Sequence, residues 1–245
     1  VNAAEYGAAQ RRRRTFIFAY SNKTKLAKER KKVPSIDIIE KDGIFAKAFP
    51  IASHTVVREG ELSDDIEDVS DNFSFAFENS GFMRDGSIFT TKYTPKLEPS
   101  ITLGEVLEKD KVDEKFFITA EKMPKWEYLK NTKKIERTSS TGYKYTFSEG
   151  AVAFPDAWDK PSRTMLTSES TLNRSTHVVR DIKNSRLRLL TPLETERLQG
   201  FDDNWTNTGM PDRMRYFCMG NALVVPMITR IGKELDKIIA NEELS

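Results

Sequence analysis

The amino-acid sequence predicts an α/β protein in which a small, irregular α+β region separates an early strand from a helical C-terminal part. The early strand is expected at 15–20 (TFIFAY), because aromatic and β-branched residues are typical of strands. A helix with clear start and stop signals at 192–199 and an amphipathic pattern after residue 224 predict that the C-terminal part is helical. With 245 residues, 38% of them hydrophobic, the chain can form one large domain or two small ones.

The first half of the chain is expected to mix loops, short helices and one hairpin. Residues 21–32 are polar and basic, which is typical of a loop or a short exposed helix. Ser63 opens an acidic stretch that fits either a short helix or a flexible loop. Two β-like runs within 73–93 flank Asp85 and Gly86, a turn dipeptide, and therefore predict a hairpin.

Helical patterns become stronger after residue 100. Thr102, with Glu105 three residues later, forms a capping box, and 113–130 is also expected to be helical. Residues 141–155 are instead typical of short strands and loops. Toward the end, apolar residues recur at spacings of three and four and predict a terminal amphipathic helix: Val225, Ile228, Ile231, Leu235 and Ile238.

The helix at 192–199 has a well-marked start and end. Thr191 is its expected N-cap, Pro192 suits the first helical position, and Glu194 completes a capping box. Gly200 stands where the end of the helix needs a left-handed residue. This punctuation predicts a helix and by itself implies no function.

The charge, cysteine and histidine content limits the kinds of partner, disulfide and metal site that the chain can have. Lys and Arg number 39 against 37 acidic residues, so the global balance identifies no partner, while 11–32 is locally basic and 59–71 locally acidic. The single cysteine, Cys218, excludes an internal disulfide and points to a reducing compartment. His54 and His177 are isolated, so no metal site is expected, and no apolar run is long enough to predict a membrane span.

Three segments, in this order, resemble the eighth, ninth and tenth blocks of the cytosine-C5 DNA methyltransferases. The middle one is the most specific, although Asp202 stands where that family usually has proline. The segments are Gln10-x-Arg12-x-Arg14 before the early strand, Arg188 to Phe201 around the punctuated helix, and Gly220 to Val224 before the terminal helix.

The resemblance implies a division of the chain. Residues 1–20 would hold the last strand region of a Rossmann-like, S-adenosylmethionine-dependent catalytic domain that is otherwise missing. Residues 21–186 would be a target-recognition domain, 187–215 the ninth-block helix and its connection, and 216–245 a helix returning to the catalytic domain. The start at Val1 also suggests a piece of a longer protein.

The resemblance assigns a flipped-cytosine pocket to the first segment, because the reacting base must leave the duplex stack. Arg14 would bind O2 of the cytosine, Arg12 would support the pocket and the adjacent phosphate, and Gln10 would orient the water or base near C5. Side chains alternate along an extended chain, so these three would share one side. Arg11 and Arg13 would face solvent or DNA phosphates.

Other family positions concern DNA, the cofactor and internal pairing. A Thr-Leu-like dipeptide that contacts DNA has two candidates, Thr164 and Thr171, of which Thr164 has the more usual spacing. Asn221 and Ala222 resemble positions near the methionine end of S-adenosylmethionine. Alternatively, Gly220 and Asn221 are a plain loop-to-helix junction. The internal pairing groups of the ninth block would be Arg188, Glu194 and Arg197.

The family's Pro-Cys, Glu-Asn-Val and Phe-x-Gly-x-Gly motifs do not occur in this sequence. Cys218 follows Phe217 and is expected to be a buried apolar residue, not a nucleophile. We therefore expect part of a bacterial or phage enzyme, cytoplasmic and nucleoid-associated, that acts on double-stranded DNA and is inactive without its N-terminal half. A non-catalytic sequence-specific DNA-binding subunit, a tRNA cytosine-C5 methyltransferase fragment and an unrelated domain with chance motifs are the alternatives.

Overall fold

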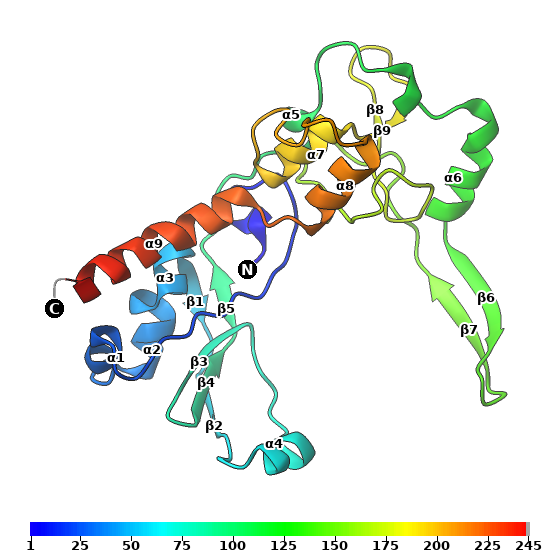
Figure 1. The fold of residues 1–245 in the computed structure, drawn as a ribbon. Helices are drawn as coiled ribbons and strands as arrows, with labels where there is room; N and C mark the ends of the chain where they lie inside the picture. Colours follow the sequence, from blue (N-terminus) through cyan, green and yellow to red (C-terminus); the bar gives the residue numbers. More distant parts are fainter. Residues whose placement is uncertain (244–245) are drawn as a thin grey trace. The chain divides into compact units, whose positions relative to one another are not determined.

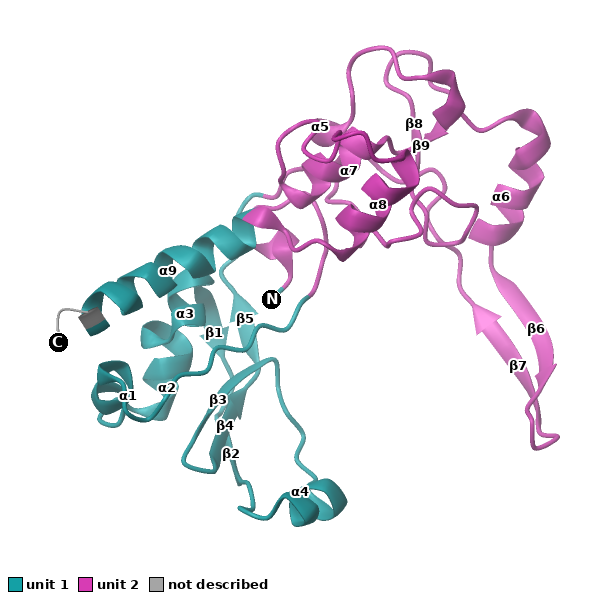
Figure 2. Cartoon of the chain, viewed as in Figure 1, with its two compact units in different colours: residues 1, 14–99, 226–245 teal, residues 2–13, 100–225 magenta. Residues whose placement is uncertain are grey.

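The structure, a computed structural model, describes residues 1–243 and divides the chain into two compact units (Figures 1 and 2). Unit 1 comprises residues 1, 14–99 and 226–245, and unit 2 comprises 2–13 and 100–225. The boundary near residue 100 lies inside the segment 21–186 that is predicted to be one recognition domain. The compact units and the predicted functional segments are therefore different divisions of the chain.

Among the described residues, the strands of unit 1 form two small antiparallel sheets. The hairpin predicted around Asp85 and Gly86 is confirmed: both residues have positive φ, 49° and 86°, as a tight turn requires. One sheet has the order β2 (Arg58–Glu61), β4 (Ser87–Thr91), β3 (Ser80–Arg84), and the other pairs β1 (Ile51–His54) with β5 (Tyr93–Pro95).

The helices of unit 1 are mostly short, apart from the terminal one. The predicted amphipathic helix is confirmed as α9 (Val225–Glu243), with Pro226 at its start, where a missing N–H costs nothing. Glu242 of this helix accepts bonds from the backbone N–H groups of Lys25 and Leu26, 2.9 and 2.6 Å away, and so caps a second helix. The remaining helices are α1 (Lys25–Arg30), α2 (Ser35–Asp37), the π-helix η2 (Ile38–Asp42), α3 (Ile44–Ala48) and α4 (Ile66–Asn72).

The strand predicted at 15–20 is wrong: within the described residues this stretch is irregular. Its aromatic residues pack instead of pairing in a sheet, with the Phe16 ring centroid 6.3 Å from those of both Phe45 and Phe49. β-propensity measures how well a side chain packs on a half-buried surface, and here a helix supplies that surface. Residues 1–243 contain only antiparallel sheets, so the predicted Rossmann-like contribution of this strand is not observed.

Unit 2 is built around helices with two hairpins. Its core cluster consists of small and branched apolar side chains from five separate stretches: Ala9, Leu103, Val106, Leu107, Val179, Leu190 and Leu198. The helices are η1 (Ala3–Glu5), α5 (Leu103–Val106), η3 (Glu114–Phe116), η4 (Ala120–Lys122), α6 (Met123–Lys130), α7 (Pro192–Gln199) and α8 (Asp212–Asn221). The hairpins are β6 (Lys133–Thr138) with β7 (Lys144–Glu149), and β8 (Val178–Arg180) with β9 (Leu187–Leu189).

The helix caps that the sequence predicts in unit 2 are present, although one predicted helix and one predicted loop are not. Both predicted capping boxes are present, at Thr102 and at Thr191, and Gly200 ends α7 with φ of 79°. Residues 113–130 form three short helical pieces instead of one helix. The loop expected at Gly220 and Asn221 is wrong, because both residues are the last turn of α8.

Candidate functional site

The basic N-terminal segment enters unit 2 with its side chains alternating between interior and surface. Gln10 and Arg12 are buried, at 0% and 2% exposure, whereas Arg11 and Arg13 are exposed. Arg14 departs from the expected alternation, because its side chain is exposed and it belongs to unit 1. The three residues predicted to share one pocket are therefore not all placed in one unit.

Arg12 joins three stretches of unit 2 that are far apart in sequence. Its Nη1 donates to the carbonyl oxygen of Met165 at 2.9 Å, and its Nη2 donates to those of Gly220 and Ala222 at 2.8 and 3.0 Å. A planar guanidinium suits this task because its donors have fixed directions and it stays charged. Since Arg12 is almost completely buried, this arrangement leaves it no surface for a base or a phosphate.

Gln10 holds the same partner from the other direction. Its Oε1 accepts a bond from the backbone N–H of Met165 at 2.9 Å, so both backbone groups of Met165 are bonded by the N-terminal segment. The Nε2 atom of Gln10 is buried and has no partner among the residues that the structure describes. Gln10 is thus placed to position the 162–165 stretch, not to face solvent.

The two threonine candidates have different surroundings. Thr164 donates its hydroxyl to the carbonyl oxygen of Arg11 at 2.7 Å, so it lies directly beside the basic segment. Thr171 donates to Ser168 within a local turn, at 2.8 Å. The structure brings Thr164, together with Met165, to the stretch that carries Gln10 and Arg12, and it does not do so for Thr171.

Gly220 is required by a close approach of two backbones. A Cβ at this position would lie 2.4 Å from both N and Cα of Thr167, far inside any normal contact. The last turn of α8 therefore rests on the 166–167 stretch, next to the bonds made by Arg12. Ala222 uses its N–H for the helix end and its carbonyl for Arg12, while Asn221 keeps an exposed side chain.

We expect Gly220→Ala to lower the free energy of unfolding by about 2 kcal/mol, because the added methyl group must displace the backbone of Thr167. Gly232→Ala is the matched control, since a Cβ at this position of α9 meets nothing within 4 Å. It should be stabilising by up to about 1 kcal/mol, the helix propensity gain of alanine. Urea denaturation of both variants measures the difference, and equal stability of the two would contradict it.

The ninth-block segment contains a buried ion-pair network. Arg188 donates Nη1 and Nη2 to the two carboxylate oxygens of Glu194 at 2.8 and 2.7 Å, and its Nε to Asp181 at 3.0 Å. Burial opposes the charge on Arg188, but these hydrogen bonds and opposite charges hold its pKa above its ordinary value. Glu194 also accepts from the N–H groups of Thr191 and Glu108. Arg197 instead pairs with Asp203 at 2.7 Å.

Sequence reasoning missed a second polar interior around the 163–177 stretch. Arg163 pairs with Asp156 at 2.7 Å, and Glu169 bonds His177, which is 0% exposed, at 2.9 Å. Lys130 is 1% exposed and donates Nζ to the carbonyl oxygens of Arg174, at 2.9 Å, and Thr176. Isolated charged residues in irregular stretches follow no hydrophobic period, so the sequence does not mark them as buried.

Lys130 makes stability depend on pH. Burial, together with the nearby positive charge of Arg163, lowers its pKa from 10.5 to about 8. Between these values the unfolded chain binds more protons, so the folded state gains stability as pH rises. We expect the wild type to gain about 2 kcal/mol over Lys130→Met between pH 7 and pH 10. Denaturation curves at both pH values test this, and a constant difference between the two proteins would contradict it.

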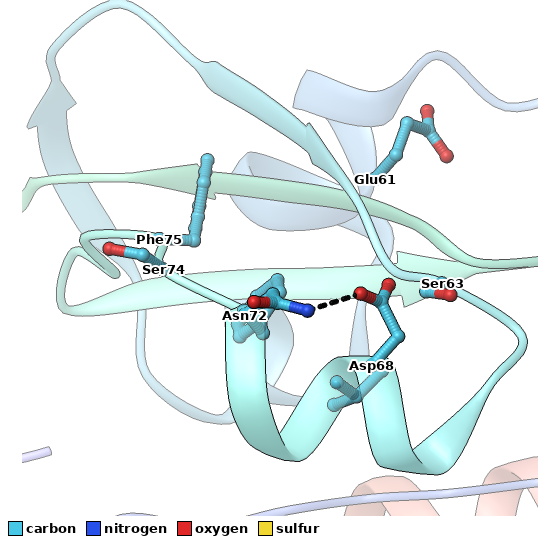
Figure 3. Close-up of a pocket in the computed structure, with 8 residues that line it drawn as sticks. Glu61, Ser63, Asp68, Asn72, Ser74 and Phe75 are labelled. Atoms are coloured by element: carbon cyan, nitrogen blue, oxygen red, sulfur yellow. Dashed lines mark hydrogen bonds between the residues drawn. The ribbon is translucent and has the colours of Figure 1, made fainter.

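An open pocket in unit 1 is lined by carboxylates and does not suit a DNA-binding site. It is lined by the end of β2 and by α4, and its ionisable groups are Glu61 and Asp68, the latter bonded by Asn72 at 2.8 Å (Figure 3). Two carboxylates repel a phosphate backbone. Among residues 1–243, no cluster of His, Cys, Asp or Glu could hold a metal ion, and no helix is long and apolar enough to cross a membrane.

Comparisons with known proteins agree on one family. The model of the C-5 cytosine-specific DNA methylases matches residues 1–237. The type II methyltransferase M.Sau3AI of Staphylococcus aureus is 51% identical over 250 residues, covering 100% of this chain and 60% of that protein. M.DsaV of Dactylococcopsis salina, also a type II methyltransferase, is 29% identical over 139 residues, or 57% of this chain and 36% of that protein.

A similar solved structure is also a methyltransferase. The Entamoeba histolytica methyltransferase EhMeth is 16% identical, covers 76% of this chain and 54% of its own, and superposes with a TM-score of 0.42. The chain spans about 60% of the length of its Staphylococcus aureus relative. Because the family model matches nearly the whole sequence, the chain belongs to the C-5 cytosine-specific DNA methylase family.

Proposed function

We propose that this chain supplies the target-recognition region and part of the flipped-cytosine pocket of a cytosine-C5 DNA methyltransferase. One observation carries the proposal: Gln10 and Arg12 of the first family segment bond Met165, beside the candidate Thr164, and Gly220 and Ala222 of the last family segment. Positions that a family motif scatters along the sequence thus meet in one buried cluster. Such a cluster holds the backbone of residues 10–12 in place within unit 2.

The roles of the arginines follow from their exposure. Arg14 is exposed and would donate to O2 of the flipped cytosine, while Arg12 is a positioning residue, because both its Nη groups donate to backbone carbonyls. Arg11, Arg13 and Thr164 would contact DNA phosphates, which orient a protein on the duplex without reading its sequence.

S-adenosylmethionine would supply the electrophilic methyl group. Of the two positions predicted beside it, only Asn221 fits a direct contact, since its side chain is exposed at the end of α8. Ala222 has both backbone groups engaged within unit 2. Asn221 would therefore bind the methionine end of the cofactor, and Ala222 would keep that helix end in place.

The nucleophile would come from another polypeptide segment. The family's cysteine attacks C6 of the flipped base, yet Cys218 lies in α8 after Phe217, and no Pro-Cys pair occurs in these 245 residues. We therefore expect the chain alone to be inactive and to require a partner that carries the cysteine, the adjacent acid and most of the cofactor loop.

A methyl-transfer assay tests this proposal. The chain is mixed with S-adenosylmethionine carrying a tritiated methyl group, a long mixed-sequence duplex, and a polypeptide matching the part of the Staphylococcus aureus relative that the chain does not cover. Tritium should enter the DNA only when both polypeptides are present. No transfer to duplex DNA, or transfer to tRNA alone, would contradict the proposal.

Arg14→Ala should lower methyl transfer by this mixture by about 100-fold, the usual effect of removing one donor from a developing charge. Arg13→Ala is the matched control, since it removes an exposed arginine from the adjacent position. It should change the rate no more than a few-fold at moderate salt. Equal losses for both variants would show that the segment contributes only general positive charge.

A further inference from the structure

The β6–β7 hairpin is exposed along almost its whole length. The pairing runs without a break from Lys133 opposite Glu149 to Thr138 opposite Lys144, and Gly142 takes a φ of 83° in the turn. Six residues in each strand give a ribbon about 20 Å long. Figure 1 shows it extending away from α6, and most of its residues are exposed.

The register gives the ribbon two different faces, because partners directly opposite each other share a face. One face carries all the apolar and aromatic residues of the two strands: it pairs Ile135 with Phe147 and Arg137 with Tyr145, with Lys133 and Glu149 at its base. The Arg137 guanidinium lies 4.1 Å from the centroid of the Phe147 ring. The other face carries hydroxyl groups, two lysines and one carboxylate, from Lys134, Glu136, Thr138, Lys144, Thr146 and Ser148.

An isolated two-stranded ribbon is only marginally stable in water, so its direction must be fixed at its base. Arg174 fixes the base by bonding the chain just before β6 and just after β7. Its Nη1 donates to the carbonyl oxygens of Leu129 and Asn131 at 3.0 and 3.3 Å, and its Nη2 donates to that of Gly150. Lys130 in turn donates to the carbonyl of Arg174. One guanidinium therefore anchors the ribbon to the 164–177 stretch.

We propose that the β6–β7 hairpin is a DNA-reading ribbon that enters the major groove with its hydroxyl face toward the bases, and that Arg174 is its positioning residue. This inference rests on the proposed function. The major groove is wide enough for a two-stranded ribbon, and hydroxyl groups can donate to and accept from base edges. Lys134 and Lys144 stand on the same face and suit phosphates at the groove walls.

The charge of the β6–β7 hairpin favours DNA over a second copy of the chain as its binding partner. The strands carry four cations, Lys133, Lys134, Arg137 and Lys144, against two carboxylates, Glu136 and Glu149. Exposed lysines along both strands discourage edge-to-edge pairing with an identical ribbon. A polyanion instead neutralises them and releases counterions.

The test uses the reconstituted methyltransferase mixture and reads which sites in a mixed-sequence duplex become methylated. Thr138→Ala/Thr146→Ala should relax the sequence preference about tenfold at the positions read. Lys134→Ala/Lys144→Ala should weaken DNA binding about equally for all sequences and make the slope of log affinity against log salt shallower by about 2. Ile135→Val/Tyr145→Phe, on the opposite face, is the control and should leave both properties unchanged.

Arg174→Ala should raise the KM for DNA and relax site preference while leaving kcat within a few-fold, and Arg174→Lys should restore part of the preference. A merely structural role would instead lower the apparent kcat through loss of folded protein and leave the KM for DNA and the site preference unchanged. The inference is overturned if the wild-type mixture is active but the threonine and lysine variants keep its site preference and salt slope. It is also overturned if these variants only abolish self-association. An inactive wild-type mixture would instead refute the proposed function.

Discussion

Replacing Glu194 with alanine is expected to lower the free energy of unfolding by about 3–5 kcal/mol. The substitution removes both oxygens of Glu194 that Arg188 bonds and leaves the two Nη groups of a guanidinium that is 0% exposed without their carboxylate. Asp181 would then be the one carboxylate still paired with Arg188, through Nε. The substitution also leaves the N–H groups of Thr191 and Glu108 without their acceptors. Breaking one partner of a buried pair costs far more than the pair contributes relative to apolar residues.

Urea denaturation followed by tryptophan fluorescence measures this loss. Glu114→Ala is the matched control, because Glu114 also forms a two-pronged pair with an arginine, Arg186, in the same unit but in solvent. Exposed pairs contribute little, so this control should resemble the wild type. A Glu194→Ala protein as stable as the Glu114→Ala protein would show that the network does not hold α7 in place.

Arg12→Ala should lower the free energy of unfolding by about 3–4 kcal/mol, since it deletes three charge-assisted bonds to Met165, Gly220 and Ala222. Arg12→Lys should recover only part of the loss, because an ammonium group lacks the fixed fork that reaches all three carbonyls. The same denaturation experiment applies.

The neighbouring Arg13→Ala protein is the control for Arg12. Arg13 is exposed, so its loss should leave the unfolding curve unchanged within error. In the reconstituted methyl-transfer mixture, Arg12→Ala should also reduce the rate at temperatures where it remains folded, because the first family segment is no longer tied to Met165 and to the last family segment. Unchanged stability and rate would place Arg12 outside the positioning cluster.

The elements that the sequence could predict are those with characteristic capping or turn residues. Thr191, Pro192 and Gly200 define α7 because capping and left-handed ends depend on the residue itself and its immediate neighbours. The β3–β4 hairpin follows from its Asp85-Gly86 turn for the same reason. The β6 strand was not predicted, because a ribbon exposed on both faces shows no hydrophobic alternation.

The sequence predicted which residues belong to the candidate site better than it predicted their contacts. Alternation separates Gln10 and Arg12 from Arg11 and Arg13, and burial follows the same division. Nothing in the sequence shows that the first pair would turn inward and bond backbone carbonyls, since those partners lie more than 150 residues away. Gly220 is similar: its need for close approach depends on the distant Thr167.

The most direct test of the central claim is where a trapped cytosine becomes attached. Long mixed-sequence duplex is prepared with 5-fluorocytosine, whose C5 fluorine cannot leave as a proton does, so the cysteine–C6 bond formed during methyl transfer persists. The chain is incubated with this DNA, S-adenosylmethionine and the complementing polypeptide, and the adduct is located by mass spectrometry. We predict an adduct on the complementing polypeptide and none on Cys218. An adduct on Cys218 would contradict it.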